Sequence, residues 1–305
     1  MKKVLIALLL VTSATAIGWQ NRVNVLVWAM PKLTALTSPV APNRPVKWSA
    51  GPDAAVLPAE QRPPNIILIM TDDMGFNDIS LYNGGAADGS LMTPNIDALA
   101  AEGVRFDNGY SGNAVCAPSR AISMTGRYNT RFGYEFTPFP KIGVTIIQWM
   151  LDQNPGPLPA FIDAEKADAM PGVYEAGMPA SEITVAELLQ GHGYYTAHIG
   201  KWHLGNATDY FPADRGFDWC STNAGGPRQH FDVEMVRNRK CFPTKGFRED
   251  AFFDEAMTFI DESGHQPFFL YLCTFSPHTP LDAPVDLIEK YKAMGLNDTH
   301  ACYLA

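Results

Sequence analysis

Two short apolar runs constrain the fold of this chain more than any other feature. NIILIM at residues 65–70 and PFFLYLCTF at residues 267–275 contain almost no polar side chain, and charged or histidine residues follow each run closely. A continuous apolar run of this kind is typical of a parallel strand that is buried on both faces. YYTAHIG at residues 194–200 is predicted to form a further strand of the same sheet.

Helical patterns alternate with these strands. In TPNIDALAAEG, Thr93 has the character of an N-cap and Pro94 that of a first helical residue. TVAELLQGHG contains a capping box formed by Thr184 and Glu187. Helices are predicted at residues 93–103, 118–125, 184–193 and 248–264, and a short strand at residues 104–106. Strands that alternate with helices predict an α/β fold with a doubly wound, largely parallel sheet.

The first 64 residues are predicted to precede the folded domain. Lys2 and Lys3 are followed by an apolar stretch that ends in an A-x-A pattern, so residues 1–30 are interpreted as a signal peptide, or as a signal anchor if they are not cleaved. Residues 31–64 are rich in proline and predict a linker. The catalytic domain would then occupy residues 65–305. We expect a periplasmic or secreted protein, which would be membrane-anchored if the N-terminal segment is retained.

The net charge of −9 argues against nucleic acid as a partner. Positive charge for an anionic substrate would have to be concentrated inside a site, because the protein as a whole does not attract anions.

The five cysteines are an odd number for an exported chain. Cys220 and Cys241 are predicted to form a disulfide, and Cys273 is predicted to be a buried free thiol. The sequence has no C-x-x-C pattern, which argues against a zinc site built from cysteines.

Polar residues follow the predicted strands at the point where each strand ends. They are Asp72 and Asp73, then Lys201 and His203, then His278. Ligands of open α/β sheets bind outside the carboxyl ends of the strands, so we expect these residues to converge at one edge. Cys116 enters the helix predicted at residues 118–125, which should face the same edge.

The residue types at this edge are compatible with binding of a cation and of an anion. Two adjacent carboxylates repel each other unless a cation neutralises them, and hard oxygen ligands favour Ca²⁺ or Mg²⁺ over zinc. Arg120, Lys201, His203 and His278 would line a pocket for a tetrahedral oxyanion such as sulfate or phosphate. Taken singly, Asp72 and Asp73 could form a solvated turn, and the histidines could be structural loop residues.

Cys116 has several possible roles on these grounds alone. A helix N-terminus favours an anionic group, which suits a nucleophile beside a cation and an anion pocket. An unmodified thiolate is nevertheless oxidisable in an exported protein and is repelled by an anionic ester. The residues therefore leave open core filler, half of a disulfide, a metal ligand and a nucleophile.

A family resemblance narrows this choice. CAPSRAISMTGRY at residues 116–128 resembles the signature C-x-P-S-R followed by T-G-R of the Type I sulfatases, the formylglycine-dependent, arylsulfatase-like members of the alkaline-phosphatase superfamily. NIILIMTDDMGFNDISLYNGG, TPNIDALAAEGVRFDNGYS, GYYTAHIGKWHLG and PFFLYLCTFSPHTPL are similar to other segments of that family, in the same order. The match covers roughly residues 63–305. It implies an alkaline-phosphatase-like α/β sandwich and hydrolysis of sulfate esters.

The resemblance also implies a modified nucleophile and a metal. A separate formylglycine-generating enzyme or sulfatase maturase would convert Cys116 to formylglycine, whose hydrated gem-diol attacks the sulfur of a sulfate ester and later expels sulfate by collapse of the hemiacetal. Asp72, Asp73 and the diol at residue 116 would bind Ca²⁺, with Mg²⁺ the less favoured ion.

The basic residues receive roles by the same resemblance. Arg120 would hold the formylglycine, and Lys201 would bridge the sulfate and the leaving oxygen. His203 would assist the diol, and His278 would bind sulfate or protonate the leaving group.

The resemblance leaves the substrate and part of the metal shell undefined. In the family, an Asp–Asn pair and a further lysine follow the helix that begins near HACYLA at residues 300–305, so the chain is expected to lack its C-terminal part. Loops 134–180 and 206–245, with Arg228 and His230, would select a sulfated small molecule or glycan, or would be ordinary solvated loops. A phosphonate or phosphodiester hydrolase of the superfamily and a non-catalytic binder of sulfated glycans are the rival interpretations.

Overall fold

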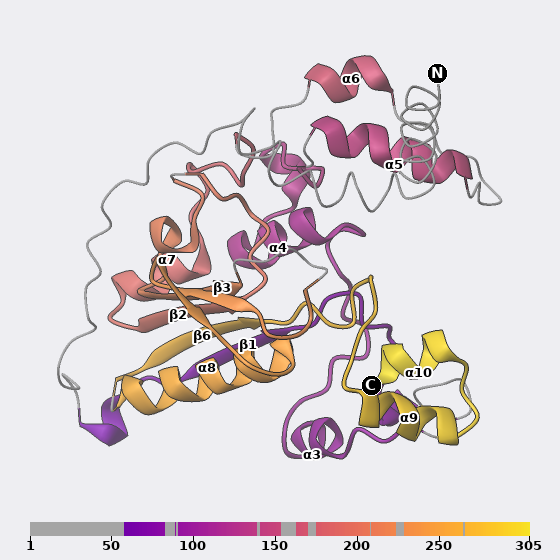
Figure 1. The fold of residues 1–305 in the computed structure, drawn as a ribbon. Coiled ribbons are helices and arrows are strands. Elements are labelled where there is room, and N and C mark those ends of the chain that lie inside the picture. Colours follow the sequence, from indigo (N-terminus) through magenta and orange to yellow (C-terminus); the bar gives the residue numbers. More distant parts are fainter. Residues whose placement is uncertain are drawn as a thin grey trace, which may run out of the picture. The chain divides into compact units, whose positions relative to one another are not determined.

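The computed structural model of residues 1–305 describes most of the chain after residue 57 (Figure 1). The described residues are 58–82, 89, 91–138, 141–153, 163–169, 175–207, 209–223, 229–264 and 266–305. The predicted signal segment 1–30, most of the predicted linker 31–64 and Arg228 lie outside them. Among the described helices, none combines the length and apolar character needed to cross a bilayer.

The chain divides into two compact units. The smaller one includes Thr137–Gly177 and Gly205–Thr208, and contains helices α5 (Lys141–Gln153) and α6 (Ala164–Ala169). The larger one includes Pro45–Phe136, Met178–Leu204 and Asp209–Ala305. All of the candidate site residues that the structure describes belong to the larger unit.

A six-stranded sheet forms the centre of the larger unit, in the order β1-β6-β2-β3-β4-β5. The strands are β1 (Ile66–Met70), β2 (Tyr195–Gly200), β3 (Trp219–Asn223), β4 (Glu234–Arg237), β5 (Lys240–Pro243) and β6 (Phe268–Cys273). The pairs β1–β6, β6–β2 and β2–β3 are parallel, whereas β3–β4 and β4–β5 are antiparallel. The predicted α/β class with a largely parallel sheet is confirmed.

The described helices of this unit number six, and the first four match the predicted segments closely. They are α3 (Pro94–Glu102), α4 (Cys116–Thr125), α7 (Val185–Gly191), α8 (Arg248–Ser263), α9 (Val285–Ala293) and α10 (Asp298–Leu304), with short 3₁₀ turns at Ala59–Gln61, Ser80–Tyr82, Asn129–Arg131 and Pro212–Arg215. The predicted capping box of α7 is present, because the backbone N–H of Glu187 donates to Thr184 Oγ1 at 3.0 Å. Helix α4 begins at Cys116, two residues earlier than predicted, and ends at Gly126 with φ 64°.

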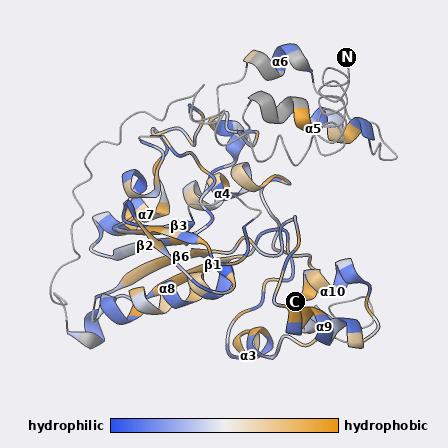
Figure 2. Ribbon diagram, in the orientation of Figure 1, coloured by the Kyte–Doolittle hydropathy of each residue, from blue (hydrophilic) through white to orange (hydrophobic). Residues whose placement is uncertain are grey.

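Strand β6 connects the two apolar cores that cover the faces of the sheet. All six of its residues are buried. Alternate side chains, Phe269, Tyr271 and Cys273, join a core that includes residues of α4 and α7. The other three, Phe268, Leu270 and Leu272, join a core that includes Phe252 and Phe259 of α8. Figure 2 shows the hydrophobic colouring of β6 beside the mixed colouring of α8, as expected for a two-sided strand and an amphipathic helix.

Strand β1 differs from the prediction that it is buried on both faces. Ile66, Leu68 and Met70 pack against the first of these cores, but Ile67 is 49% exposed and Ile69 is 53% exposed. Within the described residues β1 is the edge of the sheet, and α8 contacts β2, β3 and β6. An apolar run alone does not tell which of its faces a neighbouring element covers.

Two local predictions on α3 and the segment after it are wrong. Thr93 stands at the N-cap position but makes no capping bond, because its side chain bonds Ser80 and Asp97 instead. Residues 104–106 form no strand within the described part of the chain, and Val104 and Phe106 are about four-fifths exposed. A β-favouring segment needs a neighbouring strand to pair with, and the structure describes none beside these residues.

The predicted disulfide between Cys220 and Cys241 is also wrong, since both cysteines are free. Cys220 is buried on β3 and Cys241 is exposed on β5, with β4 between them. Two strand spacings of about 4.8 Å exceed the roughly 7 Å between Cα atoms that a disulfide can bridge. Cys273 is a fully buried free thiol, as predicted, and burial raises its pKa to about 11.

Candidate active site

Backbone hydrogen bonds continue past the ends of β1, β2 and β6 and bring their loops together. The N–H of Thr274 donates to Met70 O at 3.1 Å, and the N–H of Asp72 donates to Ser276 O at 3.4 Å. The N–H of Lys201 donates to Cys273 O at 2.9 Å. The three loops that carry the predicted site residues therefore leave the sheet side by side.

Gly200 makes the close approach of β2 and β6 possible at this edge. Its φ is 99°, a conformation that side chains disfavour, and a Cβ atom there would lie 1.8 Å from Cys273 O. Glycine at the end of β2 thus allows Lys201 to leave the strand directly beside the loop that follows β6.

Asp72 is a buried carboxylate held by two cations. It is 4% exposed, bonds Lys201 Nζ through Oδ2, and has its Oδ1 3.4 Å from Arg120 Nη2. Lys201 is 5% exposed and Arg120 is 2% exposed, so all three charges are shielded from water. Two positive charges against one negative charge leave a local excess of positive charge, which suits an anionic ligand.

Helix α4 delivers both Cys116 and Arg120 to this cluster. The two residues are four apart, so they lie on the same side of the helix. Cys116 Sγ is 3.2 Å from His203 Nδ1, and Arg120 Nη1 donates to Lys201 O at 2.9 Å. The N-terminal half of α4 is therefore held to the loop after β2 at two points.

His203 is neutral in this environment. Burial and, to a smaller extent, the positive charges of Lys201 and Arg120 lower its pKa to about 4. Its backbone has a positive φ of 61°, and Tyr134 Oη donates to its carbonyl at 3.5 Å. Burial raises the pKa of Tyr134, with a smaller contribution from Cys116. A neutral imidazole beside residue 116 can accept or donate a proton there.

Asp73 and His278 form a more open pair at the same edge. Their closest atoms, Asp73 Oδ2 and His278 Nε2, are 3.8 Å apart, and the Asp73 side chain is 62% exposed. His278 Nδ1 bonds the carbonyl of Thr279. Because a carbonyl can only accept, Nδ1 carries the proton of this bond and Nε2 points toward Asp73.

The two aspartates fit part of a Ca²⁺ or Mg²⁺ site by their chemistry. Both supply hard oxygen donors at the carboxyl edge of the sheet, although the oxygens of Asp72 would share an ion with Lys201 and Arg120. The described residues contain no group of three or more His, Cys, Asp or Glu side chains placed to hold a metal ion. Ca²⁺ takes roughly six to eight oxygens, so the described side chains would supply only a part of its shell.

Sequence reasoning missed a buried pair that supports the loop after β6. Glu249, in the first turn of α8, accepts from the backbone N–H groups of Phe275 at 3.3 Å and Ser276 at 3.1 Å. Arg248, with 0% exposure, donates to Glu249 and, at 2.9 Å, to the carbonyl of Gln229. Adjacent opposite charges at a helix start are usually solvated, so the sequence alone gave no signal of this burial.

His230 belongs to the same supporting layer. It is 4% exposed, which rules out a solvated loop residue. Its carbonyl accepts from the N–H of Arg248 at 2.7 Å, and burial, with the nearby charge of Arg248, lowers its pKa. Arg228, the other loop residue considered for contact with a sugar, lies outside the described residues.

Comparisons with known proteins agree on one family. The model of the family described as Sulfatase matches residues 64–305. The N-acetylgalactosamine-6-sulfatase of Homo sapiens is 34% identical over 246 residues, which cover 73% of this chain and 41% of the human protein. The arylsulfatase of Klebsiella aerogenes is 29% identical over 249 residues, which cover 77% of this chain and 47% of that protein. The chain thus spans less than half the length of these relatives.

Solved structures show the same architecture. The crystal structure of Ps i-CgsB has a TM-score of 0.62 at 28% identity, over 79% of this chain and 51% of that one. Its complex with k-i-k-neocarrahexaose has a TM-score of 0.61. BT4656, in complex with its substrate D-glucosamine-2-N,6-O-disulfate, has a TM-score of 0.56 at 27% identity, over 77% of this chain and 38% of that one. The alkaline-phosphatase-like α/β fold expected from the sequence is confirmed.

Proposed function

The chain belongs to the sulfatase family, and from this premise we propose that the complete protein hydrolyses sulfate esters. One observation carries the proposal. Cys116 contacts His203 next to the buried cluster of Asp72, Lys201 and Arg120, at the carboxyl edge of the sheet. These are the positions that match the sulfatase signature segments.

The buried cations would bind the sulfate group. Lys201 and Arg120 carry one more charge than Asp72 neutralises, and all three are nearly inaccessible to water. Charges act more strongly on a ligand in such a low-dielectric site than at an open surface. Lys201 would stabilise the negative charge that develops on sulfate and on the leaving oxygen.

Residue 116 would provide the nucleophile. Converted to formylglycine by a formylglycine-generating enzyme or sulfatase maturase, it would supply a hydrated aldehyde for attack on sulfur. His203, 3.2 Å from the side chain of Cys116, is placed to accept a proton there, and its lowered pKa keeps it neutral at pH 7. Arg120, one turn further along α4, would hold this side chain toward the pocket.

Asp72 and Asp73 would hold a Ca²⁺ ion, with Mg²⁺ as the less favoured alternative. The ion would supply positive charge that makes a bound hydroxyl easier to ionise. His278, on the more open side near Asp73, would bind sulfate or donate a proton to the leaving oxygen.

A sulfated glycan is the proposed class of substrate. The human relative is named for a sulfated amino sugar, and two similar structures contain D-glucosamine-2-N,6-O-disulfate and k-i-k-neocarrahexaose. A periplasmic or secreted location is proposed from the N-terminal segment, with a membrane anchor if residues 1–30 are retained. The maturase would then act on the chain during export.

The test uses the full-length gene product co-expressed with a maturase. Peptide mass spectrometry should show the conversion of Cys116 to the aldehyde, and the protein should hydrolyse an aryl sulfate faster than phosphate diesters or phosphonates. A Cys116→Ser variant that stays unconverted should show no turnover, since serine lacks the second oxygen that expels sulfate. Converted protein that binds sulfated glycans without hydrolysing any sulfate ester would contradict the proposal.

A further inference from the structure

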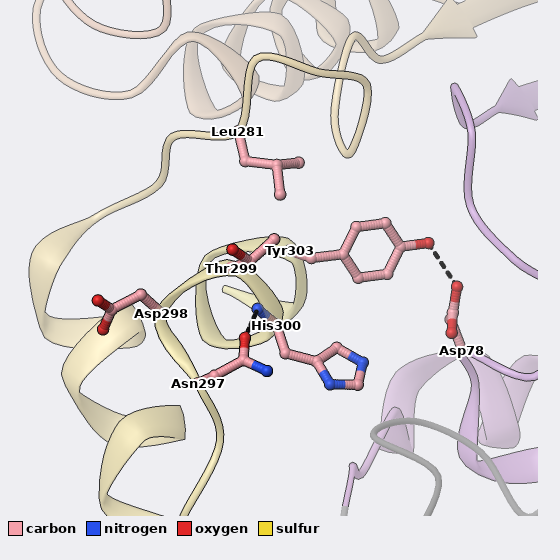
Figure 3. A pocket seen from close by; sticks show the side chains of 7 residues that line it. All are labelled: Asp78, Leu281, Asn297, Asp298, Thr299, His300 and Tyr303. Atoms are coloured by element: carbon pink, nitrogen blue, oxygen red, sulfur yellow. Dashed lines mark hydrogen bonds between the residues drawn. The ribbon is translucent and has the colours of Figure 1, made fainter. Parts of the chain in front are cut away.

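A tyrosine more than 220 residues away in sequence fastens the loop that carries Asp73. The hydroxyl of Tyr303, in α10, accepts from the N–H of Gly75 at 3.1 Å and lies 3.2 Å from Asp73 O. It also bonds the carboxylate of Asp78, as Figure 3 shows. The hydroxyl has one proton, so it donates to one of these two acceptors at a time.

Asp78 closes the same loop from the other side. The N–H of Gly75 donates to Asp78 Oδ2 at 2.6 Å, and the N–H of Asp78 donates to Gly75 O at 3.1 Å. A Cβ atom on Gly75 would lie 2.4 Å from Asp78 Oδ2, so this closure depends on glycine. Gly75, Asp78 and Tyr303 therefore form one hydrogen-bonded unit immediately after Asp73.

Asp73 needs external support. Its φ is 65°, in the left-handed region that costs a non-glycine residue about 1 kcal/mol or more. Its side chain is 62% exposed, so packing contributes little to its orientation. The bond of its carbonyl to Tyr303 restrains the peptide unit that follows Asp73.

We propose that Tyr303 and Asp78 are positioning residues, which orient Asp73 so that its carboxylate points to the edge of the sheet. They act through the backbone of residues 73–78 and need not touch the substrate. The consequence for Ca²⁺ rests on the proposed function: a loosened loop would present one of the two carboxylates less often in the orientation that binds the ion.

The test compares two tyrosine variants of the full-length protein. Tyr303→Phe removes the hydroxyl that bonds the loop. Tyr82→Phe is the matched control, because the Tyr82 hydroxyl also donates to an aspartate, but to Asp107 at 3.3 Å and not to the unit formed by Gly75, Asp78 and Tyr303. Calorimetric titration with Ca²⁺ should give a Kd about tenfold higher for Tyr303→Phe, which is about 1.4 kcal/mol. The Kd of Tyr82→Phe should stay within about twofold of the wild type.

Two further measurements separate positioning from general stability. The double variant Tyr303→Phe, Asp78→Asn should weaken Ca²⁺ binding by less than the product of the two single effects, because both residues act on one loop. A thermal unfolding temperature lowered in Tyr303→Phe without any change in the Kd for Ca²⁺ would overturn the inference.

The inference can fail separately from the proposed function. If the wild-type protein does not bind Ca²⁺, the calcium part of the proposed function is wrong, and amide hydrogen exchange of residues 73–78 decides the positioning role. Faster exchange in Tyr303→Phe than in Tyr82→Phe supports it, and equal exchange overturns it.

Discussion

Lys201 and His278 follow neighbouring strands but differ in burial, and this difference determines what each substitution should do. The His278 side chain is 28% exposed, so His278→Ala should lower kcat about 10²–10³-fold without lowering the unfolding temperature. Lys201→Ala should lower kcat similarly but also destabilise the fold, by up to about 3 kcal/mol, because buried Asp72 loses a partner. Aryl sulfate kinetics with urea unfolding would check both. An unchanged rate in either variant would remove that residue from the site.

His198 is a buried histidine outside the proposed chemistry, and it should make stability depend on pH. It is 0% exposed, with the rings of Trp202, Phe217 and Tyr271 within 5.1–5.7 Å, and burial lowers its pKa to about 3. In the unfolded chain its pKa is about 6.5. The contribution of neutral His198 to the free energy of unfolding is therefore complete above pH 6.5 and decreases as the pH falls toward 3. At pH 5 the free energy of unfolding is lower by about 2 kcal/mol for this reason.

The variant His198→Phe isolates this contribution. It keeps an aromatic ring at the position and removes the titration. Urea unfolding at pH 7 and pH 5 should show that the wild type loses about 2 kcal/mol more between these values than the variant. His203 is present in both proteins, so its own lowered pKa cancels in the comparison. Parallel pH profiles would show that His198 is not held neutral by burial.

The site residues that could be predicted from sequence are those whose position follows from an element boundary. Asp72, Lys201 and His278 were found because an apolar strand ends just before each of them. Glu249 and Tyr303 were not found, because Glu249 acts through a contact 26 positions away and Tyr303 through one more than 220 positions away. No local pattern encodes such a contact, and charged or hydroxyl residues on helices are usually solvated.

At the scale of elements, two glycines of β2 and its preceding turn test whether the close approach of β2 and β6 is needed to form the site edge of the sheet. Gly193 precedes this strand and Gly200 ends it, with φ values of 84° and 99°. Gly193→Ala meets no atom within 4 Å and should cost only about 1 kcal/mol of backbone strain. Gly200→Ala would place a Cβ 1.8 Å from Cys273 O and should greatly reduce soluble expression and the unfolding temperature. Equal effects of the two variants would mean that β2 and β6 separate there at little cost.

The elements themselves were predictable where a continuous apolar run or a period of 3.6 residues was clear, as in β6, α7 and α8. The β4–β5 hairpin was missed because its turn, Asn238–Arg239, has two positive φ values without the glycine that usually marks such a turn. The prediction that β1 is buried on both faces was wrong for a different reason. The sequence of a strand shows how apolar its side chains are, whereas the burial of each face depends on which elements the whole fold packs against it.

At the scale of the whole molecule, the distribution of charge separates the site from the surface. The chain carries a net charge of −9, yet Arg120 and Lys201 are buried around a single carboxylate. An anionic substrate would therefore be attracted at short range inside the pocket and not by the protein as a whole. Ile67 and Ile69 are exposed on β1, the edge strand of the described sheet, and they form a second feature at this scale, a surface prone to associate with other chains.

The charge distribution at the site and the exposed edge of β1 predict how a protein of residues 1–305 compares with a longer one of the relatives' usual length. The quantities compared are aryl sulfate hydrolysis, Ca²⁺ affinity and aggregation. The described residues offer two carboxylates and, after conversion, the diol at residue 116 for Ca²⁺, whereas the ion takes roughly six to eight oxygens, so water would have to supply much of the shell. Binding should be weak, and Asp73 would remain an exposed charge beside a buried one. We therefore expect residues 1–305 to show far lower aryl sulfate hydrolysis than the longer protein, even with Cys116 converted, and to aggregate more readily through β1. The measurement compares specific activity, the Kd for Ca²⁺ and light scattering of the two proteins, each expressed with the same maturase. Equal activity and equal Ca²⁺ affinity would show that Asp72 and Asp73 with solvent suffice, and that the proposed metal site needs no further side chains.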